Sequence, residues 1–451
     1  MTLRYLTAGE SHGPALVGIL EGMPAGVPVA REHIGHQLAR RRLGTGRSPR
    51  MAWEGDDFEL LGGVRHGATL GSPVAVLIRN AEWDKWAQAM SPDPPADPEA
   101  VAASGRGQPL TRPRPGHADL VGSQKYGYDD VRDALERASA RETAARVALA
   151  TVARELLTAT GIAVVSHTVR IGEVSTDAPA PSPEGQAEVD TDPVRCADPA
   201  ASQAMVAAIE RAKSDRDTLG GVVEVVATGL PPGLGSHVHW DRKLDTRLAG
   251  ALMSIQAFKG VEIGEGFASA ATPGSAAHDE IELAEDGYTR RTGRSGGLEG
   301  GMTTGGPLRV RAAMKPLSSL AQPLATVDTH TGEPAQAITQ RSDVCAVPRA
   351  GVVCEAVVAL ELAAALLDKT GGDSLAEVQR NLAHYRADLS RRSPSPGSPA
   401  TAGETPGSSA SGGAGQAPGG SASDGPGQAP PGDAPSGASA PGWSDSAPDR
   451  P

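Results

Sequence analysis

The sequence contains little cysteine, few aromatic residues and no long apolar run. Its three cysteines, Cys196, Cys345 and Cys354, have no C-x-x-C spacing and form no even-numbered set that could build a disulfide framework. This pattern favours structural thiols in a reducing cytoplasm. The N-terminus lacks the basic and then apolar pattern of a signal peptide, and no stretch of about twenty apolar residues predicts a transmembrane helix. We therefore expect a cytoplasmic protein with neither a membrane span nor a metal site.

Positive charge is scarce overall but concentrated in two places. The net charge is −12 and aromatic residues make up 3% of the chain, which argues against a non-enzymatic module that docks RNA through spread basic charge and stacking rings. Arginines nevertheless cluster in "ARRRLGTGRSPR" (39–50) and "TRPRPGHAD" (111–119). Because guanidinium groups bind phosphate and carboxylate bidentately, we interpret these clusters as part of a recessed site for a small anion. A solvated basic helix end is the simpler interpretation of the first cluster taken alone.

The composition of the chain changes near residue 391. Residues 391–451 consist mainly of Ser, Pro, Gly and Ala and cannot bury enough apolar surface to offset their chain entropy, so we predict a disordered tail. Residues 1–390 alternate between strand-like and helix-like patterns without a linker, which predicts one large α/β domain with β-sheets packed around long helices. The expected strands are 16–22, 72–80, 162–174, 220–230 and 307–314. The expected helices are 130–160, 198–213, 241–258, 350–369 and 374–389.

The segment Gly9-Glu10-Ser11-His12-Gly13 fits the G-x-S-x-G pattern of a serine hydrolase elbow. An elbow needs a strand before the serine, a helix after it, and a sheet already laid down beside it. Only ten residues precede Ser11, and the stretch "ALVGILEG" after the motif is strand-like. The pattern therefore gives little support to a nucleophilic Ser11. His12 either caps a Gly-rich turn or acts in a functional site.

Histidine and arginine recur in two further segments. Two prolines stiffen the approach to His117 in "TRPRPGHADLVGSQKYG", and histidine is the side chain best suited to proton transfer near neutral pH. In the expected helix 130–160, Arg137 and Arg141 are four residues apart and should share a face. An anion between them would relieve their repulsion, and Ser139 would add a hydroxyl donor. Both segments are candidate parts of one anion site.

Three later segments add polar groups next to glycines. The Gly-rich stretch 296–319 ends at Lys315 and two serines, which is typical of a loop that holds phosphate. "SIQAFKGVEIG" (254–264) and "QRSDVCAVPRAGVVCEAV" (340–357) are similarly polar before apolar runs.

Together these segments resemble the signatures of the chorismate synthase family. The resemblance depends on GESHGPALVGILEGMP, ERASARETAARVALATV and RSDVCAVPRAGVVCEAV, which occur in the family's order and spacing, and it extends from about residue 3 to 390. It implies a β-α-β sandwich and a lyase that converts 5-enolpyruvylshikimate 3-phosphate to chorismate and phosphate by anti-1,4-elimination. That reaction is the last step of the shikimate pathway to aromatic amino acids. The resemblance also implies a homotetrameric flavoprotein that needs reduced FMN, with NADPH as a candidate reductant.

The resemblance assigns roles to individual residues. Those implied to be catalytic are His12, which would protonate the departing phosphate, His117 beside the reduced flavin, and Asp343, which would assist proton transfer at the flavin. Those implied to bind the substrate or the phosphate of NADPH are Arg41, Arg47 and Arg141. Those implied to bind the flavin are Arg137, Ala138, Ser139, Gln256, Ala257, Gly300, Lys315, Pro316, Leu317, Ser318, Ser319 and Arg341.

One stretch departs from the family pattern, and one alternative function stays open. Ser48-Pro49 stands where relatives often carry small residues, which leaves the shape of that arginine loop uncertain. No G-x-G-x-x-G turn follows a strand, so a Rossmann dehydrogenase is not supported. A flavin-independent phosphate lyase or phosphatase acting on a small anionic metabolite would use the same arginines and histidines. Activity only with reduced flavin would exclude that alternative.

Overall fold

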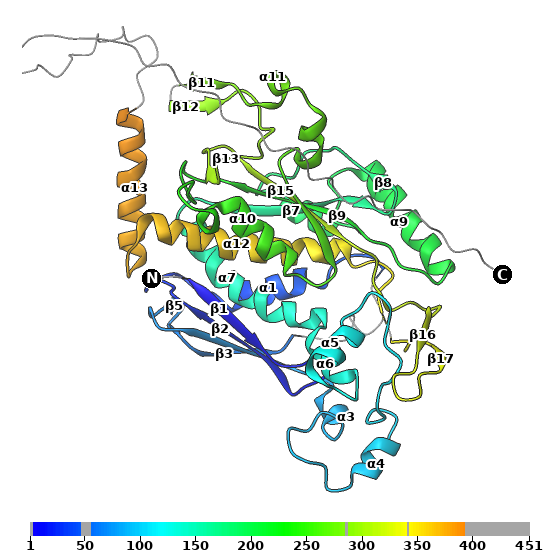
Figure 1. Ribbon diagram of the computed structural model, residues 1–451. Coiled ribbons are helices and arrows are strands. Elements are labelled where there is room, and N and C mark those ends of the chain that lie inside the picture. Colours follow the sequence, from blue (N-terminus) through cyan, green and yellow to red (C-terminus); the bar gives the residue numbers. More distant parts are fainter. Residues whose placement is uncertain (1–2, 47–55, 285–286, 341, 393–451) are drawn as a thin grey trace, which may run out of the picture. The chain divides into compact units, whose positions relative to one another are not determined.

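Two antiparallel β-sheets lie on either side of a layer of long helices in the computed structural model (Figure 1). The structure describes residues 3–46, 56–284, 287–340 and 342–392. All of these residues fall in one compact unit. The predicted single α/β domain of the β-α-β sandwich type is therefore confirmed. The predicted tail lies outside the described residues, except for Arg391 and Arg392, which complete the last helix.

The first sheet has the strand order β1-β2-β6-β3. Its strands are β1 (Arg4–Ala8), β2 (Ala15–Glu21), β6 (Val74–Arg79) and β3 (Phe58–Gly62). Alternation along β2 points Leu16 and Leu20 into the core, where helix α7 (Thr143–Ala159) packs on β2 and β6. A Cβ atom on Gly18 would lie 3.0 Å from the Leu149 side chain. The glycine therefore lets α7 approach the sheet closely.

The second sheet has the strand order β10-β15-β9-β7-β8. Its strands are β10 (Phe258–Ile263), β15 (Leu308–Met314), β9 (Gly221–Thr228), β7 (Ala163–Ile171) and β8 (Val174–Ser175). Helix α12 (Val347–Thr370) packs on β7, β9 and α7. It is long and apolar enough to cross a membrane, but 94% of its most apolar window is buried inside the protein. A helix that is apolar all round is typical of a domain core.

The remaining elements surround this sandwich. The helices and helical turns are α1 (Arg31–Arg40), α3 (Trp83–Trp86), α4 (Pro98–Ala103), α5 (Asp119–Tyr126), α6 (Arg132–Arg137), η1 (Ala140–Glu142), α8 (Gln186–Thr191), α9 (Pro199–Ser214), η2 (Trp240–Arg242), α10 (Leu244–Met253), η3 (Gly266–Ala271), α11 (Gly274–Ala277) and α13 (Leu375–Arg392). The short strands are β4 (Val64–Arg65), β5 (Ala68–Thr69), β11 (Ile281–Ala284), β12 (Gly287–Arg290), β13 (Leu298–Glu299), β14 (Met302–Thr303), β16 (Ala325–Val327) and β17 (Pro334–Gln336).

Two of the predicted helices are wrong in extent. The expected helix 130–160 is broken at Ser139, whose backbone is extended (φ −68°, ψ 140°) and whose hydroxyl accepts the N–H of Arg141. Serine competes in this way for backbone groups and often caps a helix instead of continuing one. The expected helix 241–258 is limited to α10, because the chain enters β10 at Phe258. Arg137 and Arg141 therefore do not lie on one helical face.

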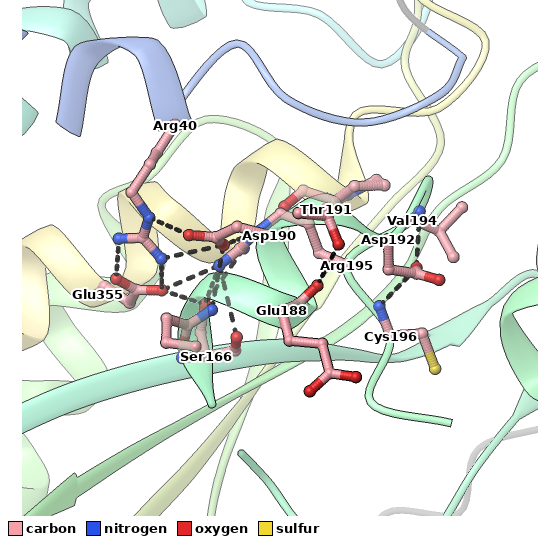
Figure 2. Close-up of polar contacts among 12 residues, drawn as sticks. Arg40, Ser166, Glu188, Asp190, Thr191, Asp192, Val194, Arg195, Cys196 and Glu355 are labelled. Atoms are coloured by element: carbon pink, nitrogen blue, oxygen red, sulfur yellow. Dashed lines mark hydrogen bonds and ion pairs between the residues drawn. The ribbon is translucent and has the colours of Figure 1, made fainter. Parts of the chain in front are cut away.

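A buried cluster of charged residues fastens α1 to α12 and to the second sheet. Figure 2 shows Glu355 of α12 facing Arg40, Arg195 and Ser166. The Glu355 carboxylate accepts from Arg40 at 2.7 Å and from Arg195 at 3.1 Å, and Asp190 binds both of these arginines. Because Arg40 is paired with Glu355 and Asp190, it is not available to bind a small anion. The interpretation of the whole cluster 39–50 as part of an anion site is therefore wrong for Arg40.

The cluster also explains a glycine inside α12. A Cβ atom on Gly351 would lie 2.5 Å from the guanidinium of Arg195. Arg195 has no solvent exposure, so its guanidinium must fit against the helix surface at this position. Burial would raise the pKa of Glu355, but the charges of Arg40, Arg154 and Arg195 outweigh it and hold the pKa well below its usual range.

Candidate active site

A cavity of about 600 Å³ lies where both sheets and the broken helix meet. Its walls come from the β1–β2 turn, the start of α5, the break before η1, the segment after α10, and the loop after β15. This volume is within the range of roughly 300–1,000 Å³ typical of small-molecule sites. The lining residues are Ser11, His12, Arg114, Gly116, His117, Ala118, Leu135, Ala138, Ser139, Ala140, Met253, Ile255, Gln256, Ala257, Phe258, Lys259, Lys315, Pro316, Leu317, Ser318, Ser319, Gln340 and Ser342.

A second cavity, of about 520 Å³, lies beside the charged cluster around Glu355. The two arginines in its wall, Arg40 and Arg154, already bind the Glu355 carboxylate. None of the predicted site residues that the structure describes lines this second cavity. We therefore take the first cavity as the candidate active site.

His12 is positioned by the turn between β1 and β2. The turn is a hairpin and not the strand–turn–helix of a hydrolase elbow. Gly9 adopts φ 104°, and a Cβ atom there would lie 2.4 Å from the Ala15 carbonyl oxygen, so only glycine fits. The His12 side chain is 10% exposed and its Nδ1 lies 2.8 Å from Glu136 Oε1. The hairpin thus holds one imidazole at the cavity wall against a buried carboxylate.

His117 is held by a second carboxylate in another wall. Its Nδ1 lies 2.5 Å from Asp119 Oδ1, and Arg114 donates to the same carboxylate from Nε at 2.8 Å. Asp119 is fully buried. Burial alone would raise its pKa, but hydrogen bonds from His117 and Arg114 outweigh burial and hold the pKa of Asp119 well below its usual range. The result is an ionised carboxylate that fixes the orientation of the His117 ring.

The loop after β15 gives the cavity a cationic, hydroxyl-rich wall. Lys315 donates to the Gly116 carbonyl oxygen. Burial and the nearby Lys259 lower the pKa of Lys315. Ser318 and Ser319 follow in the same wall, and the Ser319 hydroxyl accepts from Arg114 at 2.7 Å. Two crowded ammonium groups and two hydroxyls match the charge and the acceptor oxygens of a phosphate group.

The segment after α10 presents an unsatisfied polar atom. Gln256 lines the cavity, and its Oε1 is buried without a hydrogen-bond partner among the described residues, while its Nε2 donates to Glu142 at 3.4 Å. The next residue, Ala257, has φ 70°, which is unfavourable for a residue with a side chain. A buried acceptor without a partner is costly unless a ligand donor reaches it. A planar heterocycle with ring N–H groups has such a donor.

The structure brings several of the predicted residues together in this cavity. These are His12, His117, Ala138, Ser139, Gln256, Ala257, Lys315, Pro316, Leu317, Ser318 and Ser319. Asp343 is adjacent: its neighbour Ser342 lines the wall, and Arg349 donates to the Asp343 carboxylate at 2.5 Å. Arg137 precedes the wall residue Ala138 and donates to the carbonyl oxygens of Thr7 and Gly9.

Other predicted residues lie elsewhere. Arg141 donates to the Arg79 carbonyl oxygen, and Arg41 is buried and donates to Thr143 at 3.4 Å. Gly300 is in the turn between β13 and β14, which contacts the start of α10 through Leu244. Gln256 follows the other end of that helix, whose ten residues span about 15 Å. Within one chain Gly300 is therefore separate from the cavity. Arg47, Ser48, Pro49 and Arg341 lie outside the described residues.

Sequence reasoning missed the groups that hold the two histidines. Asp119 could have been found, because it is two residues from His117 in the same motif. Glu136 is the first residue of the stretch ERASARETAARVALATV. Helical spacing alone does not place it against His12, so the sequence does not predict this contact. Trp86 stacks on His12 from a segment without any periodic pattern. Nothing in its neighbourhood signals that contact.

Comparisons with known proteins agree on one family. The sequence model of a family described as "Chorismate synthase" matches residues 3–367. The chorismate synthase of Acidothermus cellulolyticus is 64% identical over 385 residues, covering 85% of this chain and 98% of the relative. That of Thermobifida fusca is 64% identical over 391 residues, covering 86% and 99%. A crystal structure of chorismate synthase is similar with a TM-score of 0.68 and 39% identity, covering 87% of this chain and 99% of that one.

Proposed function

The chain belongs to the chorismate synthase family and is a lyase, and on this basis we propose that it converts 5-enolpyruvylshikimate 3-phosphate to chorismate and phosphate by anti-1,4-elimination with reduced FMN bound. The reaction would be the last step of the shikimate pathway to aromatic amino acids. The observation that supports the proposal best is the composition of the cavity. Two histidines, each paired with a buried carboxylate, share it with the loop Lys315–Ser319.

The elimination breaks a ring C–H bond and the C–O bond to phosphate, and it forms a new ring C=C bond. Phosphate leaves with the electron pair of the C–O bond, so cations or a proton must offset its charge. The hydrogen that leaves is not acidic, so a carboxylate base alone is poorly suited to remove it. Reduced FMN, when bound, supplies electron density as phosphate departs and recovers it afterwards.

The cavity fits a flavin mononucleotide in two respects. Lys315, Ser318 and Ser319 would hold the FMN phosphate, because ammonium and hydroxyl groups are donors suited to phosphate oxygens. The buried Oε1 of Gln256, which accepts no hydrogen bond from any described residue, would accept a ring N–H of the flavin. The remaining proposed contacts within the cavity are Ala138, Ser139, Ala257, Pro316 and Leu317, with Arg137 directly behind them. Gly300 and Arg341 stay predictions from the family resemblance.

Each histidine has a distinct task in the proposal. His12 would give a proton to the departing phosphate, since its ring is held at the wall by Glu136. His117 would hold a proton next to the flavin, in the orientation fixed by Asp119. Asp343 would assist proton transfer from its place next to Ser342. Arg141 would face the substrate.

The source of electrons is a separate part of the proposal. Arg41 and Arg47 would bind the anionic substrate or the phosphate of NADPH, as the family resemblance implies. The Arg41 side chain is buried, with Asp56 at 3.9 Å and Thr143 at 3.4 Å from its guanidinium. If NADPH reduces the flavin on this protein, mixing NADPH with oxidised FMN and enzyme anaerobically should bleach the flavin absorbance.

Lys315→Ala should weaken FMN binding by about ten- to a hundredfold, because it removes a charge-assisted hydrogen bond to the cofactor phosphate, worth about 1.5–3 kcal/mol. Quenching of FMN fluorescence on titration with the protein measures the affinity. Lys213→Ala is the matched control, since Lys213 is an exposed lysine paired with Glu210. An affinity unchanged in Lys315→Ala would remove the loop from the phosphate site.

A phosphatase or flavin-independent phosphate lyase is the second candidate. Arg114, Lys315 and the histidines would bind a phosphate ester equally well without a flavin. The unsatisfied Gln256 Oε1 favours the flavin enzyme, because a phosphate group offers it no donor at neutral pH. Release of phosphate from the substrate in the absence of any flavin would favour this second candidate instead.

We also propose that the protein is cytoplasmic and assembles as a homotetramer, with the outer face of the first sheet as one interface between copies. Leu6 and Ile19 are directly paired across β1 and β2 on the side away from the helices and are 68% and 39% exposed. The charged residues of this face are paired with each other, Arg4 with Glu21 and Arg79 with Glu59. The face is therefore apolar, neutral and able to match a copy of itself.

Replacing Leu6 and Ile19 together with aspartate should reduce the assembly to smaller species, because four or more charges would be desolvated at each two-fold interface. Sedimentation equilibrium of wild type and variant measures this. Val238→Asp is the control, since Val238 is 62% exposed outside the sheet. A tetramer that persists in the double variant would place the interface elsewhere.

A further inference from the structure

We propose that Glu136 and Trp86 are positioning residues for His12: Glu136 keeps the ring proton on Nδ1, so that Nε2 is the nitrogen that serves the substrate, and Trp86 restrains the orientation of the ring. The inference rests on the proposed function, because that function gives His12 its role as a proton donor. The contacts of His12 with Glu136 and Trp86 are present whatever the function.

Glu136 makes two hydrogen bonds with His12. Its Oε2 accepts the backbone N–H of His12 at 2.7 Å, and its Oε1 lies 2.8 Å from the ring Nδ1. Glu136 is 2% exposed, so these bonds are shielded from water. An ionised carboxylate only accepts hydrogen bonds, so the network assigns a proton to Nδ1. The other ring nitrogen, Nε2, is on the side of the ring away from Glu136 and is the one that would serve a substrate.

The position of Glu136 depends on the break between α6 and η1, which the sequence analysis did not predict. It belongs to the last turn of α6, directly before the chain becomes extended at Ser139. Its main-chain carbonyl accepts the N–H of Ser11, so the turn of the β1–β2 hairpin is bound to α6 through both main chain and side chain. Moving the turn away from α6 would require these bonds to break together, so His12 keeps its place beside Glu136.

Trp86 covers the His12 ring. The two ring centroids are 4.0 Å apart with an interplanar angle of 26°, which is a stacked arrangement. The guanidinium carbons of Arg106 and Arg132 lie 5.6 and 5.8 Å from the centre of the Trp86 ring. An indole face attracts cations, so the two arginines help to hold the indole in place. The stacked indole in turn restrains the orientation of the His12 ring.

The consequence for the proton transfer follows from these contacts. In the transfer, the Nε2–H bond of the imidazolium breaks and an O–H bond forms on the departing phosphate. The ring returns to neutral with its proton on Nδ1, where Glu136 still accepts it. Without Glu136, the neutral ring could carry its proton on either nitrogen and the imidazolium would lose its counter-charge. Turnover should then fall more than substrate binding does.

The test uses Glu136→Gln and compares it with Glu224→Gln. Glu224 is the matched control, because it is 3% exposed and binds a buried histidine, His167, at 3.4 Å, yet does not line the cavity. We expect kcat of Glu136→Gln to fall about ten- to a hundredfold with little change in KM, as for other carboxylates that orient a functional histidine. We expect Glu224→Gln to keep wild-type kcat at a temperature where both variants are folded. Equal kcat in Glu136→Gln and wild type would overturn the proposal.

A spectroscopic readout separates this inference from the proposed function. Solid-state 15N spectra of histidine-labelled enzyme, with His12→Gln used to assign the signal, report which ring nitrogen carries the proton. We expect a protonated Nδ1 in the wild type and a mixture of tautomers in Glu136→Gln. An unprotonated Nδ1 in the wild type would contradict the inference, whether or not the protein forms chorismate.

Trp86 is tested by a conservative and a disruptive change. Trp86→Phe keeps a ring on His12 and should retain most of kcat, whereas Trp86→Leu should lower kcat about tenfold, because an aliphatic side chain cannot stack on the imidazole and restrain its orientation. Equal kcat values in the two variants would show that the stack only fills space.

Discussion

Replacing His12 with alanine should lower kcat by about a hundred- to ten thousandfold, the range for loss of a positioned general acid. FMN should bind nearly as tightly as before, because the phosphate-binding groups lie in the Lys315–Ser319 loop and not at His12. Single-turnover kinetics with pre-reduced flavin measures the chemical step directly. His278→Ala is the control, since His278 is exposed and does not line the cavity.

His117→Ala should give a loss of similar size for a different reason. It removes the ring that Asp119 and Arg114 hold next to the proposed flavin site, and among the described residues it leaves Arg114 as the charged partner of the Asp119 carboxylate. The two variants should differ in phosphate release if His12 alone serves the leaving group. Wild-type turnover in either variant would remove that histidine from the mechanism.

The second large effect concerns stability. Glu355→Ala should lower the free energy of unfolding by about 3–5 kcal/mol, because it leaves Arg40, Arg154 and Arg195 buried without their shared carboxylate. Thermal or urea unfolding measures the loss. Glu361→Ala, in the same helix, should cost about 1 kcal/mol or less, since Glu361 is partly exposed and pairs with Arg247. Similar losses in both variants would contradict the importance of the buried cluster.

The same carboxylate should make stability depend on pH. The pKa of Glu355 is lowered in the folded protein from its ordinary value of 4.5. Its contribution to the free energy of unfolding is therefore complete above pH 4.5 and is lost as the pH falls below that value. The wild type should lose stability more steeply than Glu355→Gln over that acidic range, and Glu355→Gln also provides a milder variant should the alanine variant not fold.

The sequence predicted the main layers because their patterns are strong. The alternating residues of β2 and the largely apolar sequence of α12 each favour one kind of element, and both elements lie where expected. The prediction of one helix over 130–160 was wrong because the Ala-rich sequence favours a helix on both sides of Ser139. At the break, the Ser139 hydroxyl caps the following turn and the hairpin contacts α6. Helix propensity does not contain the tertiary part of that information.

Residues of the candidate site could be predicted from the sequence only where they belong to a recognisable motif. His12, His117 and Lys315 lie in quoted motifs, and the fold brings all three to one cavity. Glu136 contacts His12 across 124 residues of sequence. Trp86 contacts His12 from a segment without any periodic pattern. Such contacts follow from the folded chain, since sequence spacing sets neighbours only within one element. The roles of the cavity residues toward flavin and substrate stay predictions.

The most direct test of the central proposal is an anaerobic assay. Purified full-length protein is mixed with 5-enolpyruvylshikimate 3-phosphate and dithionite-reduced FMN, and chorismate absorbance and phosphate release are followed together. We predict that both products form in equal amounts, and only when reduced FMN is present. Phosphate release without chorismate, or equal activity without flavin, would contradict the proposal and identify the cavity as a phosphatase or flavin-independent lyase site.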